Sequence, residues 1–486
     1  MALAAGAFIA AANAGSACHA ALVVPATLNP RTTTLPIGTS FTGISVEWNQ
    51  VRPYLQKLHG DRAATAALLR RLARLNGPPV VRVGGNSEDQ AAWNLPHRHH
   101  IPHFVHINIT RRILTELGWL SRQTRSRLIL GLNLGARRPA WAAKLMSQSE
   151  AIIRPSHILA FEIGNEPDLF GRFGKPWRGS GQPYYYRQVS AYLKVLAPMA
   201  RGRKLFAGGA FCCGWRSSTP RYIKREAAYL AVSTLHEYPL GAPVRNRRSP
   251  QFASIANLLK NSSARAYYRE ISASVIAGRK AGVPVRWGEM NSAYGGGKDG
   301  VSNTFAAALW GTDAMFETAR AGAGGVNFHM PGYYGAWLYG PRGHVRVMPL
   351  YYGMWLFAKA AGMHGRLVPV AYKRPLNIKI WAVRGSRGEL RIVILNKDLT
   401  RRAIIHLRVA GYMLSHEMRM AAASVKSRWR VRLGPWTFNG SINGDPHPVA
   451  WNRRVQTIAT VGPGAWNIPM PPASGALLVL SRRPPA

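Results

Sequence analysis

Up to about residue 362, short apolar runs alternate with helix-like segments along the chain. Each run is apolar at nearly every position, as in a parallel strand that is buried on both faces. The runs are Ser40–Glu47, Pro79–Gly85, Arg127–Leu134, Ile158–Gly164, Lys204–Ala210, Leu230–Tyr238, Val283–Glu289 and Gly324–Met330. Helical patterns such as Asp61–Leu75 and Thr304–Ala321 separate most of them. This alternation predicts an α/β fold, a (β/α)8 barrel over residues 37–362.

From about Arg366 the pattern changes to short strand-like runs separated by turns, with almost no helical periodicity. These runs are Leu376–Gly385, Leu390–Asp398, Arg401–Gly411 and Gly475–Ser481. Such a series is typical of two packed sheets. We therefore expect a C-terminal antiparallel β-sandwich over residues 366–486, to which residues 21–36 could contribute a strand.

The first twenty residues are apolar and rich in small side chains, which is the pattern of a signal peptide. Residues 1–20 are therefore predicted to be a signal that directs export to the periplasm or the cell exterior. No Lys or Arg precedes Arg31, so the usual basic leader is missing and an ordinary buried helix is an alternative. The stretch Gly15–Cys18, "GSAC", resembles a lipoprotein cleavage site, which leaves a membrane-anchored lipoprotein open. No later segment predicts stable membrane insertion.

The chain is strongly basic, with 64 Lys and Arg against 20 Asp and Glu and a formal net charge of +44. The basic residues are scattered singly, without the clusters and stacking aromatics of a nucleic-acid-binding module, so nucleic acid is not an expected partner. Two explanations of the charge remain, a polyanionic substrate and life in an acidic medium. The three cysteines, Cys18 and the adjacent Cys212 and Cys213, predict neither a disulfide framework nor a metal site. No metal or other cofactor is expected.

The scarce acids gather in "FEIGNEPDLF", where Glu162, Glu166 and Asp168 lie within seven residues. In a (β/α)8 barrel, catalytic side chains project from the C-terminal ends of the strands. "IGNEP" ends the fourth predicted strand and "WGEMN" ends the seventh, so Glu166 and Glu289 should share one mouth. Glycoside hydrolysis needs two such carboxyl groups, one on each side of the acetal bond. Asn165 is placed to donate a hydrogen bond to a sugar 2-hydroxyl.

Four stretches together resemble glycoside hydrolase family 79, the group of β-glucuronidases and heparanases within the clan of retaining barrel glycosidases. They are "GISVEWN", "RVGGNSEDQAAW", "FEIGNEPD" and "WGEMNSAYGGG". The resemblance spans the barrel from about Phe41 to Gly362, and the C-terminal sandwich agrees in type. It implies that Glu166 is the acid/base and Glu289 the nucleophile.

The same resemblance implies a set of substrate-binding residues. Glu47 matches an acidic residue that touches the hydroxyls of a uronic sugar; a barrel-mouth ion pair is its alternative role. Tyr294, Gly295 and Gly296 match a loop that receives the sugar carboxylate, and glycines suit it because bare backbone can approach an anion closely. A tight turn that needs positive φ would also explain these glycines.

Further contacts come from three other positions. His236 and Tyr238 match an active-site pair on the sixth strand, although His236 could equally be a packed core residue. Asn86 falls where the family has a polar residue from the second strand. Arg82, on that strand, is expected to stabilise the barrel interior rather than contact the substrate.

One departure concerns Phe328, which stands where heparanase-like members have a Tyr in contact with the sugar. Tyr333 or Tyr334 could supply a replacement hydroxyl. Exo and endo action are not separated by the sequence.

We therefore expect a monomeric retaining hydrolase that cleaves β-linked glucuronic or a related uronic acid from a glycoside or polysaccharide. Two alternatives remain. One is a non-catalytic, cationic polysaccharide-binding protein on a degenerate barrel, and the other is a retaining glycosidase of the same clan that acts on a neutral sugar. The presence of both carboxylates favours a catalyst.

Overall fold

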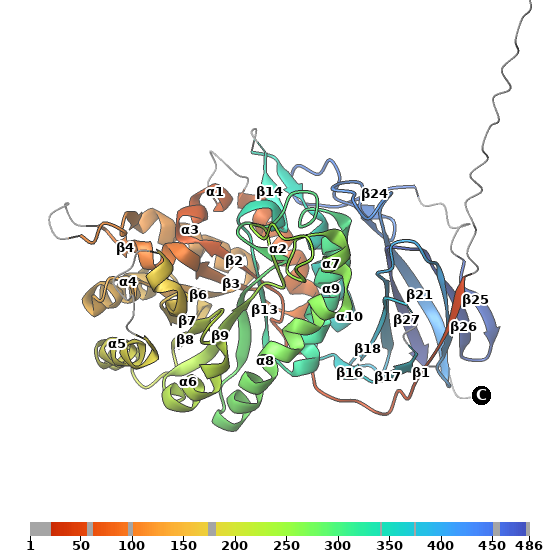
Figure 1. The fold of residues 1–486 in the computed structure, drawn as a ribbon, viewed down its shortest axis with the longest axis horizontal. Coiled ribbons are helices and arrows are strands. Elements are labelled where there is room, and N and C mark those ends of the chain that lie inside the picture. The colour runs from red at the N-terminus through yellow and green to blue at the C-terminus, as the bar shows by residue number, and fades with distance from the viewer. Residues whose placement is uncertain are drawn as a thin grey trace, which may run out of the picture.

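The computed structural model describes residues 21–55, 62–95, 101–173, 181–340, 343–373, 376–450 and 457–482. The predicted signal segment, residues 1–20, lies outside these residues. The described chain forms a barrel surrounded by helices, with a β-sandwich packed against one side of it (Figure 1).

Eight parallel strands close the barrel in the order β11-β13-β2-β3-β6-β7-β8-β9. In chain order they are β2 Gly43–Glu47, β3 Val80–Gly84, β6 Arg127–Leu132, β7 Ile158–Ile163, β8 Phe206–Phe211, β9 Leu230–Glu237, β11 Val285–Met290 and β13 Gly325–His329. Each of the eight predicted runs overlaps one of them, and only β8 and β11 extend beyond their run, by one residue each, which confirms the predicted barrel. Near their N-terminal ends the interior is filled by small and branched side chains, namely Val80, Ile129, Ala160, Ala207 and Val232.

Helices follow the strands and cover the outside of the barrel. They are α1 Val51–Leu55, α2 Arg62–Asn76, α3 Arg111–Thr124, α4 Pro139–Ile152, α5 Gly181–Leu196, α6 Thr219–Glu226, α7 Ile255–Leu259, α8 Asn261–Ala281, α9 Phe305–Ala321 and α10 Pro349–Ala361. In α9 and α10 nearly every residue is buried, because these helices lie between the barrel and the sandwich (Figure 1). Within the described residues, no helix combines the length and apolarity that a membrane crossing requires.

The sandwich consists of two sheets. The larger one has the order β16 Arg366–Val368, β18 Ile378–Arg384, β19 Leu390–Asn396, β27 Ser474–Arg482, β21 Tyr412–Ala421, β22 Arg432–Leu433, β23 Trp436–Thr437 and β24 His447–Pro448. The smaller one has the order β17 Val370–Tyr372, β1 Leu22–Leu28, β20 Ala403–Arg408, β26 Ala465–Met470 and β25 Ala459–Gly462. Alternate residues of both sheets meet in one apolar core, which includes Ile392 and Ile394 from the larger sheet and Ile405 and Ile468 from the smaller.

Strand β1 precedes the barrel in the chain but lies inside the smaller sandwich sheet, as the red strand among the blue ones shows in Figure 1. It runs parallel to β20 and antiparallel to β17. The sandwich therefore departs in this one pair from the antiparallel arrangement expected from the sequence.

Buried charges join the barrel helix α9 to the sandwich. Asp313 accepts hydrogen bonds from Lys397 Nζ at 2.6 Å and from Trp381 Nε1 at 3.0 Å. One turn further along α9, Glu317 accepts from Lys379 Nζ at 2.5 Å. All four ionised groups are buried, and burial alone would raise the pKa of Asp313, but the two lysines lower it. The ion pairs therefore fix how the two parts of the molecule sit together.

We expect Asp313→Asn to destabilise the protein strongly, because it leaves Lys397 buried without its countercharge. Losing one partner of a buried pair costs about 3–5 kcal/mol. Glu116→Gln, which removes the partner of the exposed Arg62, is the control and should cost less than about 1 kcal/mol. Denaturant unfolding of both variants measures the difference, and equal costs would contradict a structural role for the buried cluster.

Candidate active site

Glu166 reaches the barrel mouth from the short turn after β7, and its backbone is held in an unusual conformation. Gly164 has φ +78° and Glu166 has φ +45°, in the left-handed region that side chains other than glycine rarely adopt. The turn is fixed by Asp89, whose carboxylate accepts from the backbone N–H of Asn165 at 3.0 Å and from Leu134 and Gly135. Backbone strain of this kind persists only where the surroundings enforce it, which is common at functional sites.

Glu289 projects from the end of β11, where a β-bulge changes the register of the strand. The pairing with β9 shifts between Trp287 and Glu289. Gly288 lies at the shift, and a Cβ there would come within 2.8 Å of Thr234. Bulges beside active sites re-aim a side chain, and this one directs Glu289 into the mouth.

Arg82 connects the two sides of the site from inside the barrel. Its guanidinium is completely buried and donates to Glu162 at 2.5 Å, to Glu289 at 2.9 Å and to Asn165 Oδ1 at 2.7 Å. Burial alone would lower the pKa of Arg82, but the carboxylates around it raise that pKa, so the cation is permanent. Arg82 was expected to stabilise the barrel interior, and its guanidinium lies there; from that position it also binds the carboxylate of Glu289.

The carboxylates of Glu166 and Glu289 lie close together. One oxygen of each, with a ring nitrogen of His236, falls within a group whose atoms are all within 4.8 Å of one another. Burial, together with repulsion from Glu289 and Asp168, raises the pKa of Glu166 to about 8. Burial would also raise the pKa of Glu289, but cationic neighbours, His329 foremost, and a hydrogen bond from Tyr238 lower it to about 2. The site thus holds one protonated and one ionised carboxyl group at neutral pH.

His236 orients the protonated partner. Burial and the charge of Arg82 lower the pKa of His236 to about 4, so its imidazole is neutral. Nδ1 lies 2.9 Å from Glu166 Oε1, whereas Nε2 is buried without a hydrogen-bond partner in the described chain. Since an orphaned buried N–H is rarer than an orphaned acceptor, the proton belongs on Nδ1. His236 then donates to Oε1 and leaves Oε2 of Glu166 to carry the acidic proton.

Glu47, at the end of β2, and Asn86, just after β3, form another part of the mouth. Glu47 accepts from the backbone N–H groups of Ser87 at 2.7 Å and Asn86 at 3.2 Å. Asn86 Oδ1 in turn lies 3.5 Å from Asn165 Nδ2. His329, at the end of β13, bridges Glu47 and Glu289 at 3.5 and 3.6 Å. The structure therefore brings Glu47, Asn86 and Asn165 into the same site as the two glutamates.

The predicted anion loop follows β11 directly. Tyr294 lies in β12 Ala293–Tyr294, which pairs with β10 Leu240–Gly241, and its ring covers Gly241, where a Cβ would come within 2.4 Å of it. Gly295 and Gly296 have φ +81° and +83°, so the turn requires glycine, and Gly296 has no atom within 4 Å of where a Cβ would stand. Gly295 is exposed and Gly296 is half-buried. They contact neither carboxylate directly.

Tyr238 and Tyr334 form the remaining wall. Tyr238 donates to Glu289 Oε1 at 2.7 Å, and its ring stacks on that of Tyr334 with centroids 6.0 Å apart. Tyr334 also packs beside Gly297, which places it between Glu289 and the glycine loop. Tyr333 is half exposed. Of the two tyrosines proposed from the sequence to replace a sugar contact, Tyr334 is the one that lies at the carboxylates.

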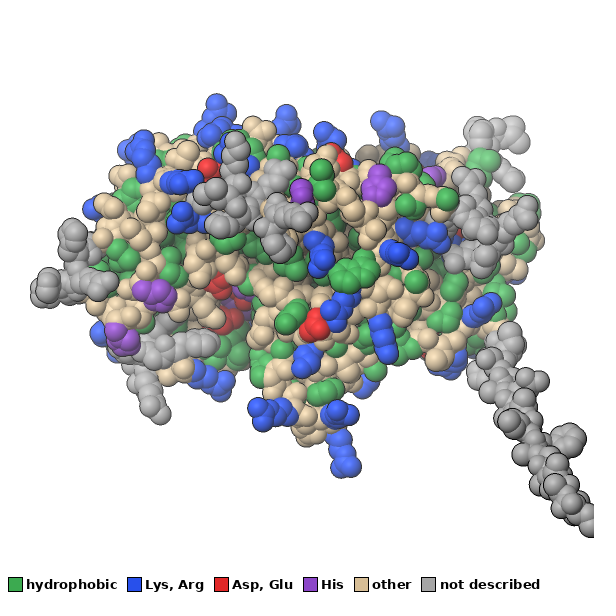
Figure 2. All heavy atoms as spheres, turned by 90° about the horizontal axis from the view of Figure 1, so that it is seen from above, with side chains coloured by type: hydrophobic (Ala, Val, Ile, Leu, Met, Phe, Trp, Pro, Cys, Tyr) green, Lys and Arg blue, Asp and Glu red, His purple; other side chains and the backbone are tan. Residues whose placement is uncertain are grey.

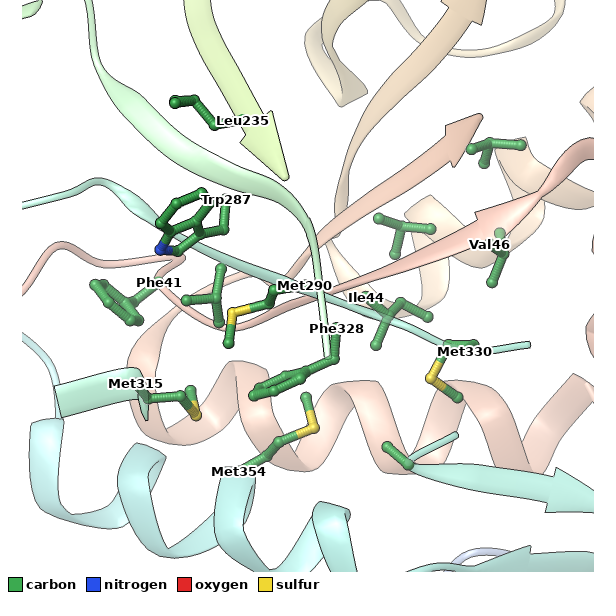
Figure 3. Close-up of a cluster of buried hydrophobic side chains, with 14 of the residues drawn as sticks. Phe41, Ile44, Val46, Leu235, Trp287, Met290, Met315, Phe328, Met330 and Met354 are labelled. Carbon is green, nitrogen blue, oxygen red and sulfur yellow. The ribbon is translucent and has the colours of Figure 1, made fainter. Parts of the chain in front are cut away.

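Phe328 does not face the mouth. Its ring is buried in an apolar cluster with Met290, Met315 and Met354, as Figure 3 shows. Successive side chains of a strand point to opposite faces, so Asn327 and His329 point inward and Phe328 points outward. The sequence put in doubt the sugar contact that heparanase-like members make at the position of Phe328, and the structure turns this ring away from the mouth. His329 is the residue of this strand that reaches the site.

Two residues of the site, His329 and Asp168, were not predicted from the sequence to belong to it. His329 is one position away from the Phe that the motif comparison singled out, and only the strand register assigns the two faces. Asp168 accepts from the backbone N–H groups of Cys213 at 2.9 Å and Trp215 at 3.4 Å, which ties the loop after β8 to the turn that carries Glu166.

Figure 2 shows acidic side chains at the floor of a hollow, in a face that otherwise carries many Lys and Arg side chains.

Paired carboxylates at the fourth and seventh strands of a closed barrel, followed by a sandwich, agree with the arrangement that the sequence predicts for a glycoside hydrolase. Sequence comparison agrees. The chain is 24% identical over 334 residues to a β-glucuronidase of Neurospora crassa, and 24% identical over 348 residues to one of Aspergillus niger. These matches cover 61% and 65% of this chain, and they span only 58% and 63% of the two relatives. No family model matches the chain.

Among solved structures, a 4-O-α-L-rhamnosyl-β-D-glucuronidase from Fusarium oxysporum superposes with a TM-score of 0.76 at 18% identity, covering 94% of this chain and all of that one. A family 51 arabinofuranosidase from Xanthomonas axonopodis pv. citri gives 0.69 at 15% identity, covering 95% of this chain and all of that one. The structural likeness establishes the fold. Together with the curated relatives, it confirms the resemblance to glycoside hydrolase family 79 that the motifs indicate.

We expect Asp168→Asn to move the alkaline limit of activity to lower pH. Glu166 must be protonated to act as an acid, so activity should fall as pH rises through its pKa of about 8. Removing the negative charge of Asp168 removes one cause of the raised pKa, so deprotonation occurs at lower pH. The pH dependence of kcat/KM on an aryl glucuronide measures the shift. Glu150→Gln, on α4, where the half-buried side chain pairs with Arg203 on the outside of the barrel, is the control, and an unmoved limit in Asp168→Asn would contradict the coupling.

Proposed function

We propose that the protein is a retaining β-glucuronidase that removes a terminal or internal uronic acid by double displacement. The observation that carries the proposal is the pair Glu166 and Glu289, whose carboxylate oxygens approach within 4.8 Å. Retaining enzymes place their carboxyl groups about 5–5.5 Å apart, whereas inverting enzymes need about 6.5–9.5 Å to admit a water. The curated β-glucuronidases support the choice of sugar.

In the first step, Glu289 attacks the anomeric carbon while Glu166 gives its proton to the leaving oxygen. The carboxylate of Glu289 is kept ionised by Arg82 and held in place by the hydroxyl of Tyr238. His236, bonded to the other oxygen of Glu166, aims the acidic proton at the glycosidic bond. Asn165, held by Arg82, faces the ring hydroxyl next to the reacting carbon.

In the second step, water hydrolyses the glycosyl ester on Glu289, and Glu166 acts as the base. Once Glu289 is esterified it carries no charge, so one cause of the raised pKa of Glu166 disappears. The pKa of Glu166 then falls, and its carboxylate can accept a proton from water. A neutral His236 does not oppose this change, because it donates a hydrogen bond to either form.

The uronate carboxylate is assigned to the glycine loop. Gly295 is exposed and Gly296 is half-buried, and Tyr294 is 39% exposed beside them. Peptide dipoles in a turn with successive positive φ angles form a concave anion site. Glu47, which already accepts two backbone hydrogen bonds, is left to bind hydroxyl groups on the far side of the ring.

The first test separates the two glutamates. We expect Glu289→Gln to abolish hydrolysis of every glucuronide, because no nucleophile remains. Glu166→Gln should lose about 10²–10⁴-fold on an alkyl glucuronide but much less in the first step on an activated aryl glucuronide, whose leaving group needs little protonation. A 2-fluoro glucuronide should label Glu289, as peptide mass spectrometry can establish. A label on another residue, or a product of inverted configuration, would refute the mechanism.

The second test concerns the sugar carboxylate. We expect wild type to prefer an aryl glucuronide to the matched glucoside, and Gly296→Ala to reduce that preference by raising KM for the glucuronide. The added methyl would stand in open space at the mouth, on a backbone with φ +83°. Gly202→Ala is the matched control, since Gly202 has φ +77° and equally open surroundings but precedes β8 at the opposite end of the barrel. Equal rates on the two sugars in wild type would instead favour the neutral-sugar alternative, to which the arabinofuranosidase neighbour belongs.

The proposal includes export. It is supported by the apolar, small-residue sequence of residues 1–20. Fractionation of cells that express the full chain, with N-terminal sequencing of the product, tests it: an uncleaved protein that stays in the cytoplasm would contradict it.

A further inference from the structure

A cavity of about 620 Å³ lies where the sandwich meets the barrel mouth. One wall is the hairpin β14 Trp337–Tyr339 and β15 Val345–Val347, and the other is the sandwich segment 428–442 between β21 and β24. Its basic and aromatic lining includes His344, Arg346, Arg428, Trp429, Arg430 and Phe438. No Asp or Glu is among the described residues that line it. The cavity is therefore cationic and has an aromatic side.

The cations of this cavity are available to a ligand. Arg346 and Arg430 are exposed and form no ion pair within the described residues. The guanidinium of Arg346 lies over the ring of Trp429, 4.8 Å from its centroid, and Trp429 is 49% exposed. Arg428 alone is partly neutralised, by Asp299 at 2.8 Å.

The walls of this cavity are connected to segments that form the candidate active site. Asp299, the partner of Arg428, follows the glycine loop by two residues. The sandwich segment is also pinned to the start of α9, since the backbone N–H groups of Phe305 and Ala306 donate to the carbonyls of Ser427 and Val425. On the other wall, β14 begins three residues after Tyr334, whose ring stacks on Tyr238 at Glu289. Both walls are thus extensions of loops that form the mouth.

We propose that this cavity is a remote subsite for an acidic saccharide, which binds anionic sugar residues of a chain whose reacting sugar lies at Glu289. The inference rests on the proposed glycosidase function and adds the class of substrate, a polyanionic oligosaccharide rather than a small glucuronide. Arginine suits the role because its planar fork matches carboxylate and sulfate oxygens. An exposed Trp offers a flat apolar face for the carbon skeleton of a sugar ring.

The experiment is calorimetric titration of the full chain, made inactive by Glu289→Gln so that no oligosaccharide is cleaved. The probes are a hyaluronan oligosaccharide, which carries carboxylates, a heparin oligosaccharide, which also carries sulfates, and a neutral chitin oligosaccharide. We expect Trp429→Ala and Arg346→Ala each to weaken binding of an acidic probe about tenfold. If the variants bind both acidic probes more weakly, carboxylate groups are sufficient for recognition by the cavity. If they bind only heparin more weakly, the cavity recognises sulfate groups. Arg154→Ala, which removes one exposed positive charge just before β7, at the opposite end of the barrel, should bind as the parent does.

Equal losses in Arg154→Ala and Arg346→Ala would overturn the proposal, because net charge rather than the cavity would then account for binding. Unchanged binding in both cavity variants, or loss of binding to the neutral probe alone, would overturn it as well. Thermal unfolding of each variant excludes misfolding, and because Trp429 and Arg346 are both exposed, neither change should disturb the fold. In the active chain, both variants should leave kcat/KM on an aryl glucuronide within about twofold. If wild type does not hydrolyse that glucuronide, the proposed function fails, while the titrations still decide whether the cavity binds acidic saccharides.

Discussion

The buried guanidinium of Arg82 is the interaction on which the site depends. A cation with no exposure to water is tolerable only where carboxylates surround it, and Arg82 has Glu162, Glu289 and Glu88 within 4 Å. Its fixed fork also imposes geometry, because it binds Glu289 from the seventh strand and Asn165 from the turn after the fourth. A single side chain from the second strand therefore sets the distance across the mouth.

The same arrangement explains how two glutamates in one pocket acquire different charges. Glu289 is bonded to Arg82 and Tyr238, whereas Glu166 is bonded to a histidine that burial and that same arginine keep neutral. The positive charge of Arg82 therefore stabilises one carboxylate directly and, together with burial, keeps His236 from becoming a cationic partner of the other. The chain has only 20 acidic residues, and several of them lie in this pocket or at the junction with the sandwich, where Asp313 and Glu317 are buried.

The sequence predicts the barrel well because buried parallel strands are apolar at most positions, and each such run proves to overlap a barrel strand. It also predicts which strand ends carry Glu166 and Glu289, since parallel order fixes the face on which they emerge. Strand register is harder: Phe328 and His329 differ by one position and point to opposite sides, and no apolar pattern separates them in a strand whose two faces are both buried. The contact between Arg82 and Glu289 was also not predicted, because the two residues lie far apart in the chain. Strand β21 was not predicted, because its mixed polar and apolar residues, such as Ser415, His416 and Glu417, resemble a loop.

The position of β1 has a consequence for how the chain is made. This strand is synthesised first, yet its partners β20 and β17 follow the whole barrel, so at typical elongation rates it waits on the order of tens of seconds for them. An unpaired strand of this kind is a template for pairing with other chains. Pro25, in the middle of β1, has no N–H to offer, and in the finished sheet it lies opposite His406 on one side and beyond the end of the β17 pairing on the other. The proline thus costs the native sheet little while making the waiting strand a poor partner for any other edge, a form of protection during biosynthesis that the folded protein no longer needs.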